Sequence, residues 1–405
     1  PFLGVSADLL TFDAIGSDDL EVLRASLDVI RGVGLAETRT VQRALEALLE
    51  RGDFERAALV ASIAEGQVAH NLVLRYSAGF LNCGKWGLVR EAMTDVDALC
   101  HCTEAHVKLI KRVLMALTRP SAKPALRPRA AGGRLPTDDE EALWLLLEAR
   151  SAQARPLQRE ASDAVDLGPF GIAARLHLRV WQLVDAGRFG EALGLVGSCP
   201  EAAQVGGVIA LCLTLDEALC RMVVGDVAAA IDSHRRAADL SATLGCPGIS
   251  SLTEAIDCVV KALAAVDLSE SEISTSLATC EKAENVLGRS LVLAIGIAHD
   301  LAAGNDVQAL VRSRILASLT SKTGPGYLYD VSRILSGIVG MRNGKRFDLG
   351  QELWSSEGMG ALAAIVESAV CGCGTPIVSE NPPPNVLWLL VLLTRDFGDV
   401  SALVR

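Results

Sequence analysis

The stretch LDEALCRMVVGDVAAAIDSHRRAADLS, from Leu215 to Ser241, contains the pattern that decides the fold. It reads as an apolar helix, a turn at Gly225-Asp226 and a second helix that opens on alanines. Glycine readily adopts the left-handed conformation that ends a helix, and an aspartate after it accepts hydrogen bonds from the first N–H groups of the next helix. Small alanines after the turn let the two helices approach closely. The stretch therefore predicts an antiparallel helix pair.

The same unit recurs along the chain, as VQRALEALLERGDFERAALVASIAE at 41–65, LHLRVWQLVDAGRFGEALGLV at 176–196 and LAIGIAHDLAAGNDVQALVRSRI at 293–315. Weaker copies turn at Gly84, Gly344 and Gly398. An aromatic residue or valine follows each glycine by two or three positions, and we expect it to pack back against the first helix. A single pair cannot bury both of its apolar faces, so neighbouring pairs must stack. The expected fold is all-α, a right-handed α-solenoid of antiparallel helix pairs.

The spacing of the turns sets the repeat length. Gly187 and Gly225 are 38 residues apart, and Gly304 and Gly344 are 40 apart. The interval from Gly225 to Gly304 is long enough for two units, with a further turn expected at 267–269. Gly52 and Gly84, in contrast, are 32 residues apart. In the second half of the chain the period is therefore near 38–40 residues, longer than the 34 of a standard tetratricopeptide repeat.

Capping signals mark where several helices begin. A Ser or Thr followed three residues later by Glu is the signature of a capping box, in which each residue satisfies the other's free N–H group. The pattern occurs at three places, and Ser17 is expected to cap a helix that runs through Ile30. The three predicted boxes are Thr137 with Glu140, Ser251 with Glu254, and Ser269 with Glu272.

Segments rich in Pro and Gly divide the chain into four parts. Residues 1–119 are predicted to form N-terminal helical repeats, and 120–136 a Pro/Gly/Arg-rich loop. Residues 137–370 would form the main tetratricopeptide-like array. Residues 371–405 would supply a connecting loop and a terminal helix pair.

The composition limits the class of function. The 405 residues are 50% hydrophobic, 21% charged and only 4% aromatic, which favours packed helices over disorder or β-structure. A net charge of −11 disfavours binding of nucleic acid through this chain, because the overall field repels phosphate. Eleven cysteines, most of them within apolar helical patterns, indicate reduced core thiols and a cytoplasmic protein. The most apolar stretch, 386–393, is too short to span a bilayer, so no membrane partner is expected.

A search for catalytic and metal-binding motifs favours a protein without chemistry of its own. The Gly-Lys pair at 344–345 lacks the spacing and the Ser/Thr of a phosphate-binding loop. Cys100, Cys102 and His106 offer soft ligands, as does the pair Cys371 and Cys373, but neither group has the usual zinc spacing. We therefore expect no catalytic residue, no metal and no cofactor, although an all-α enzyme whose site is assembled from distant residues remains an alternative.

The phrases LVDAGRFGEALGLV and GDVAAAIDSHRRAADLSATLG resemble tetratricopeptide-like repeats of the long-period kind. They are similar to the superhelical sensor region of MalT-like, LuxR-type bacterial ATPase regulators, over roughly residues 170–320. In such regulators the superhelix binds an inducer or an inhibitory protein, and controls an ATPase and a helix-turn-helix domain. The resemblance implies that this chain is the sensor part of a larger regulator.

These observations predict a non-catalytic module that binds a protein or peptide on a preformed helical surface, with a small effector as a further possible ligand. The alternatives are a scaffold subunit of a large organellar or cytoplasmic assembly and, less favoured, an RNA-binding helical-repeat protein. Polar positions on the first helices of the pairs are the candidate ligand-binding residues: Arg179, Gln182, Arg221 and His299.

Overall fold

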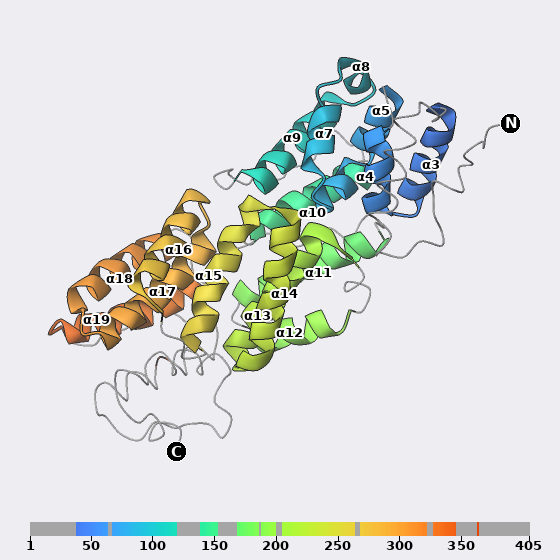
Figure 1. The fold of residues 1–405 in the computed structure, drawn as a ribbon. Coiled ribbons are helices and arrows are strands. Elements are labelled where there is room, and N and C mark those ends of the chain that lie inside the picture. The colour runs from blue at the N-terminus through green and yellow to red at the C-terminus, as the bar shows by residue number, and fades with distance from the viewer. Residues whose placement is uncertain are drawn as a thin grey trace, which may run out of the picture.

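The computed structural model describes residues 38–63, 67–119, 138–152, 168–185, 188–199, 205–263, 268–321, 327–345 and 363. Within these ranges the regular secondary structure is entirely α-helical and includes no strand, as predicted (Figure 1). The helices are α3 (Thr38–Glu50), α4 (Phe54–Ile63), α5 (Gln67–Arg75), α6 (Ser77–Asn82), α7 (Trp86–Ala92), α8 (Val96–Leu99), α9 (Glu104–Thr118), α10 (Asp138–Ala152), α11 (Gly168–Asp185), α12 (Phe189–Gly197), α13 (Gly207–Val224), α14 (Val227–Leu244), α15 (Pro247–Leu263), α16 (Glu270–Lys282), α17 (Val286–Ala302), α18 (Asp306–Thr320) and α19 (Tyr327–Arg342).

The predicted turn chemistry is confirmed at most of the described turns. Gly225 ends α13 in the left-handed conformation with a φ of 89°, and Asp226 accepts a hydrogen bond from the N–H of Ala229 at the start of α14. The turn glycines at 52, 84, 304 and 344 also have positive φ. A side-chain capping bond is missing at the starts of α7, α12 and α18, whose N-cap residues are Lys85, Arg188 and Asn305. Backbone hydrogen bonds form the turn before α18, and the guanidinium of Arg342 donates to Asp306 and to the carbonyl of Leu301 beside it.

One of the predicted capping boxes is present and another is wrong. Ser269 and Glu272 cap the start of α16 reciprocally. Ser251, in contrast, lies inside α15, which already begins at Pro247, and its hydroxyl accepts a hydrogen bond from Asn285. The Ser–Glu spacing is therefore coincidental there. Several other predicted features lie outside the described residues: Ser17, Thr137, Gly187, Gly398, Cys371, Cys373 and segment 371–385.

From α11 onward the helices pack in a repeating order. Each odd-numbered helix packs on the helix that follows it, as α13 does on α14 and α17 on α18. Each also packs on the next odd-numbered helix, so that α11, α13, α15, α17 and α19 contact one another in succession. Because α13 and α14 are joined only by Gly225 and Asp226 and pack together, they are antiparallel. Four pairs and α19 follow one another in this way in Figure 1.

A buried polar network joins α10, α11 and α13. Nδ1 of His177 lies 2.5 Å from Oδ2 of Asp216, and Nε2 lies 3.2 Å from the carbonyl oxygen of Ala149. The indole N–H of Trp181 donates to Oδ1 of the same aspartate at 2.8 Å. Burial raises the pKa of the Asp216 carboxyl, while both side-chain partners oppose that shift. The Asp216 carboxyl thus joins α13 to α11, and His177 in turn joins α11 to α10.

The short helix α6 links the N-terminal helices to this array. At its start, the N–H of Ala78 and the hydroxyl of Ser77 donate to Asp139 of α10. At its end, the amide of Asn82 accepts from the N–H of Ile209 and donates to the carbonyl of Gly206. Asp139 of α10 therefore caps the start of α6, and Asn82 at the end of α6 caps the start of α13 in the same way.

Further contacts bring these helices against the array. The indole N–H of Trp86 donates to the carbonyl of Leu244, which is 158 residues away in sequence. The thiol of Cys246 donates to the carbonyl of Leu117 across 129 residues. Helix α9 accordingly packs on α15, and α6 packs on α13. In a strictly linear solenoid each repeat contacts only its neighbours. The contacts between these units, which are far apart in sequence, are additional to that pattern.

Gly207→Ala is expected to destabilise the contact between α6 and α13. Gly207 has a φ of +76°, and a β-carbon there would lie 2.1 Å from the carbonyl oxygen of Asn82. Left-handed strain and the backbone clash together should lower the free energy of unfolding by about 2 to 3 kcal/mol, measured by urea denaturation. Gly245→Ala is the matched control, because Gly245 has a φ of +56° with open space around it and should cost only about 1 kcal/mol. An equal loss of unfolding free energy in the two variants would contradict the expected clash with Asn82.

Candidate functional site

The four ligand-binding residues predicted from the sequence lie on three helices of the array. On α11, Arg179 is exposed and Gln182 is half-buried. On α13, Arg221 forms ion pairs with Glu217 at 2.8 Å and Asp226 at 3.3 Å. These four residues do not line the groove that we describe below. The four residues do not come together in one site, and their role in ligand binding stays a prediction.

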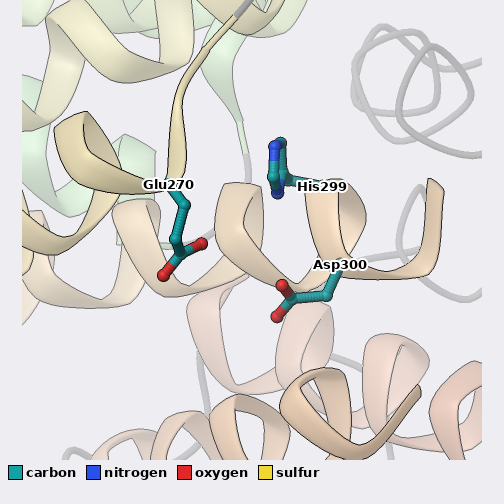
Figure 2. Close-up of side chains that lie close together, drawn as sticks. All are labelled: Glu270, His299 and Asp300. Carbon is teal, nitrogen blue, oxygen red and sulfur yellow. The ribbon is translucent and has the colours of Figure 1, made fainter. Parts of the chain in front are cut away.

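The fourth residue, His299, belongs to a cluster at the end of α17. Glu270, His299 and Asp300 bring one possible metal-ligand atom each within 4.8 Å of one another (Figure 2). Nδ1 of His299 is buried without a hydrogen-bond partner among the described residues. A His with two carboxylates is a common donor set for divalent metals.

An arginine already supplies the positive charge in this cluster. The guanidinium of Arg312 binds Asp300 at 2.7 Å, donates to the carbonyl of Gly296 at 3.1 Å and also bonds to Glu270. Arg312 is only 3% exposed. A divalent cation beside this buried guanidinium would be repelled by it. The cluster is therefore best described as a structural ion pair.

A larger feature is a groove of about 1280 Å³ on the N-terminal side of the molecule. The C-terminal ends of α3 and α5 and the N-terminal ends of α4, α9, α10 and α11 meet there, together with α6 and the residues before α13. Its lining is mixed. The aromatic residues are Phe54, Tyr76 and Phe170, the amides Asn71 and Asn82, the imidazoles His101 and His106, and the charged residues Glu50, Arg51, Arg75, Asp138, Asp139 and Glu140.

Asp139 and His106 lie at the floor of this groove. Nε2 of His106 lies 3.0 Å from the carbonyl oxygen of Leu74 and 3.5 Å from Oδ2 of Asp139. Nδ1 lies 3.9 Å from Glu140, whose carboxylate also accepts from the hydroxyl of Thr103 at 3.4 Å. Because Nε2 faces a carbonyl oxygen, it carries a proton. Two carboxyl groups and one imidazole therefore meet where α9 packs on α10.

The surroundings of Asp139 change its acidity. Burial raises the pKa of its carboxyl to about 6, and the neighbouring charge of Glu140 adds to the rise. Hydrogen bonds from Ser77 and Ala78 and the proximity of His106 act in the opposite direction. Asp139 is consequently a weaker acid than an exposed aspartate.

The arrangement of Ser77, Asp139 and His106 is not that of a nucleophilic triad. In such a triad the histidine lies between the hydroxyl and the carboxylate, so that it can take the hydroxyl proton. Here the carboxylate lies between the other two, and the hydroxyl of Ser77 donates to it at 2.7 Å. Nothing in this set activates Ser77 as a nucleophile.

The cysteines predicted as possible ligands lie at the edge of the groove or beside it. Cys102 lines the groove and is half-buried, whereas Cys100 is exposed. Burial and the charge of Asp139 raise the pKa of the Cys102 thiol, which disfavours a reactive or metal-binding thiolate. His106 is held by Leu74 and the α10 carboxylates. Cys102 and His106 thus both lie near Asp139, whereas Cys100 is exposed, and the three do not form a metal-ligand cluster among the described residues.

Comparisons of the chain with protein-family models, with curated proteins and with solved structures found no match. Among the helices that the structure describes, none combines the length and the apolar character needed to cross a membrane.

Proposed function

We propose that this protein is a non-catalytic binding module that holds an extended peptide segment of a partner protein in the groove lined by α3, α5, α6, α9, α10 and α11. On this proposal the pairs from α11 to α19 form a tetratricopeptide-like array, with the right-handed superhelix expected from the repeats. The array and the N-terminal helices together provide a rigid frame for the groove.

The observation that supports the proposal is the size and lining of the groove. At about 1280 Å³ it exceeds the range of roughly 300 to 1,000 Å³ in which small ligands are usually enclosed. The lining contains both aromatic rings, such as Phe54 and Phe170, and hydrogen-bonding groups, such as Asn71 and Arg75. Peptides are bound by such combinations, because side chains need apolar contacts while the peptide backbone needs donors and acceptors.

The polar groups at the floor also favour binding over catalysis. Asp139 is occupied by hydrogen bonds from α6, and His106 by the carbonyl of Leu74. Asn71 differs, because its Oδ1 is buried with no hydrogen-bond partner among the described residues. A donor on a ligand that reached this oxygen would be favoured, since an unpaired buried acceptor costs about 1 to 3 kcal/mol.

The proposal predicts that peptides selected by display on the intact chain bind in this groove. Removing one aromatic and one arginine contact in Phe170→Ala/Arg75→Ala is expected to weaken their affinity by about tenfold or more, because such residues dominate binding energy at interfaces. Fluorescence anisotropy with labelled peptides measures the change.

The matched control is Val307→Ala/Arg314→Ala, which removes one apolar and one arginine side chain from the exposed face of α18 at the other end of the molecule (Figure 1). It should leave affinity unchanged, and circular dichroism should show both variants folded. Failure to select any peptide, or equal binding by wild type and groove variant, would refute the proposed function.

A further inference from the structure

The solvent face of α9 carries a row of basic side chains. Four exposed cations, three on the helix and one directly after it, lie opposite its buried face: Lys108, Lys111, Arg112 and Arg119. After Glu104 the helix contains no acidic residue. Lys108 forms an ion pair with Glu104, whereas the other three cations form no ion pair with the described residues. We call these four residues the basic row.

The stability of the helix does not account for the basic row. Lys108 lies three and four residues before Lys111 and Arg112, and like charges at these spacings destabilise a helix. The helix dipole favours cations only in the last turn, which these three residues do not reach. Other exposed arginines have an acid within one turn, as Arg235 has Asp232. The basic row is thus an unneutralised positive patch on a chain whose net charge is −11.

An apolar side chain lies within the basic row. Met115 is one turn after Lys111 and one turn before Arg119, and it is 46% exposed. Few large apolar residues in the described part of the chain are so exposed. Methionine adapts its shape to a partner, and both methionine and arginine are enriched at protein interfaces. Figure 1 shows α9 at the edge of the group of N-terminal helices, so a partner can approach this face.

We propose that the basic row and Met115 form a docking surface for a short acidic segment of a partner protein, with an apolar side chain near the middle of that segment. Carboxylates of the segment pair with the cations, and its apolar side chain contacts Met115. The helix from Lys108 to Arg119 spans about 16 Å, which is the length of about five extended residues. None of these residues lines the groove, so the inference goes beyond the proposed function and does not depend on it.

The small number of cations favours a protein segment over a long polyanion. Tight binding of nucleic acid typically uses about 6 to 10 phosphate contacts, and recognition of an acidic membrane uses clusters of about 4 to 8 basic residues. With Lys108 paired to Glu104, three cations remain, which is fewer than either number. A long polyanion also meets the repulsive field of a chain with a net charge of −11. A short segment has to place only a few carboxylates beside the row.

Binding of a labelled peptide to the full chain tests this surface. The probe has about six aspartates and glutamates around a central leucine, enough to span the row. Fluorescence anisotropy should show saturable binding that weakens as salt is added, because the charges are exposed. Lys111→Glu/Arg112→Glu is expected to weaken the affinity about tenfold or more, since two attractions become repulsions. Met115→Ser should weaken it about threefold and leave the salt dependence unchanged, since an apolar contact is lost.

The matched control is Lys282→Glu/Arg314→Glu, on α16 and α18. It reverses one exposed lysine and one exposed arginine, so the net charge changes by the same amount as in the α9 variant. The affinity for the acidic peptide should change by about twofold at most, because these charges are far from the row and screened by salt. Circular dichroism should show both variants folded, since glutamate favours helices and all four positions are exposed.

Three results would overturn the docking surface. One is a lack of saturable binding of the acidic peptide, and another is an equal loss of affinity in the two charge variants. The third is tighter binding of a single-stranded DNA oligonucleotide or of phosphatidylserine vesicles than of the peptide, lost in Lys111→Glu/Arg112→Glu. Peptides selected for the groove should bind this variant as they bind the wild type, so a failure of the proposed function is seen separately.

Discussion

Asp216→Ala is expected to lower the free energy of unfolding by about 3 to 5 kcal/mol. The substitution removes the acceptor of both His177 and Trp181, and it leaves their polar groups buried in the interface of α10, α11 and α13. An unsatisfied buried group loses its hydration without a replacement, which is costlier than the loss of an exposed bond. Urea denaturation followed by circular dichroism measures the total loss, and hydrogen exchange locates it in these three helices.

Asp216→Asn should cost about 1 kcal/mol or less, because its carbonyl can accept from Trp181 and its amide can donate to Nδ1 of His177. In that arrangement Nε2–H of His177 still reaches the carbonyl of Ala149, which lies 3.2 Å away. Asp232→Ala, at an exposed carboxylate of α14, is the surface control and should change stability by about 0.5 kcal/mol at most. A loss in Asp216→Asn as large as in Asp216→Ala would show that the network requires a charged pair, contrary to this expectation.

Arg312→Ala is expected to cost a similar 3 to 5 kcal/mol, roughly, for a different reason. The change leaves Asp300, whose side chain is 2% exposed, as an uncompensated buried charge between α17 and α18. Gly296 contributes to this site as well, because a β-carbon there would lie 3.1 Å from the Arg312 side chain. Thermal and urea unfolding of the variant measure the loss.

Variants of Glu270 and Asp300, the other members of the cluster, test whether the loss comes from an unpaired buried carboxylate. Glu270→Gln should cost about 1 kcal/mol or less, because the Glu270 side chain is 52% exposed and water can replace the arginine. The double variant Arg312→Leu/Asp300→Leu should recover most of the stability lost in Arg312→Ala, since it removes both buried charges. A double variant that is less stable than Arg312→Ala would contradict the origin of the loss in an unpaired carboxylate.

The helix pairs could be predicted because their signals are local. Gly225 and Asp226 are adjacent in sequence, and the left-handed glycine and capping aspartate act within one turn of the chain. Ser269 and Glu272 likewise lie within one turn. Ser251 shows the limit of such patterns, because its Ser–Glu spacing matched a capping box while Pro247 had already started the helix.

The groove could not be predicted, because it depends on contacts between distant segments. Asp139 stands among acidic residues at a helix start, where carboxylates usually interact with the helix dipole. Its partners Ser77 and Ala78 are 62 and 61 residues away, and no sequence pattern connects them. The predicted ligand residues do not share a site because they were chosen only by their position on the first helices of the pairs. For Arg221 the sequence held a local signal, since its partners Glu217 and Asp226 are four and five residues away.

The long-range caps around α6 also bear on how the chain folds. Pairs such as α13 and α14 can form as soon as their own residues are available, because their contacts are local and quick to close. Asn82 and Trp86, however, have their partners at residues 206–209 and at Leu244. During synthesis on the ribosome the N-terminal helices emerge first, and these side chains must wait for more than a hundred further residues. Docking of α6 on α13 is thus a later event than its docking on α10, and a nascent chain stalled before residue 206 will expose the surface that α13 eventually covers.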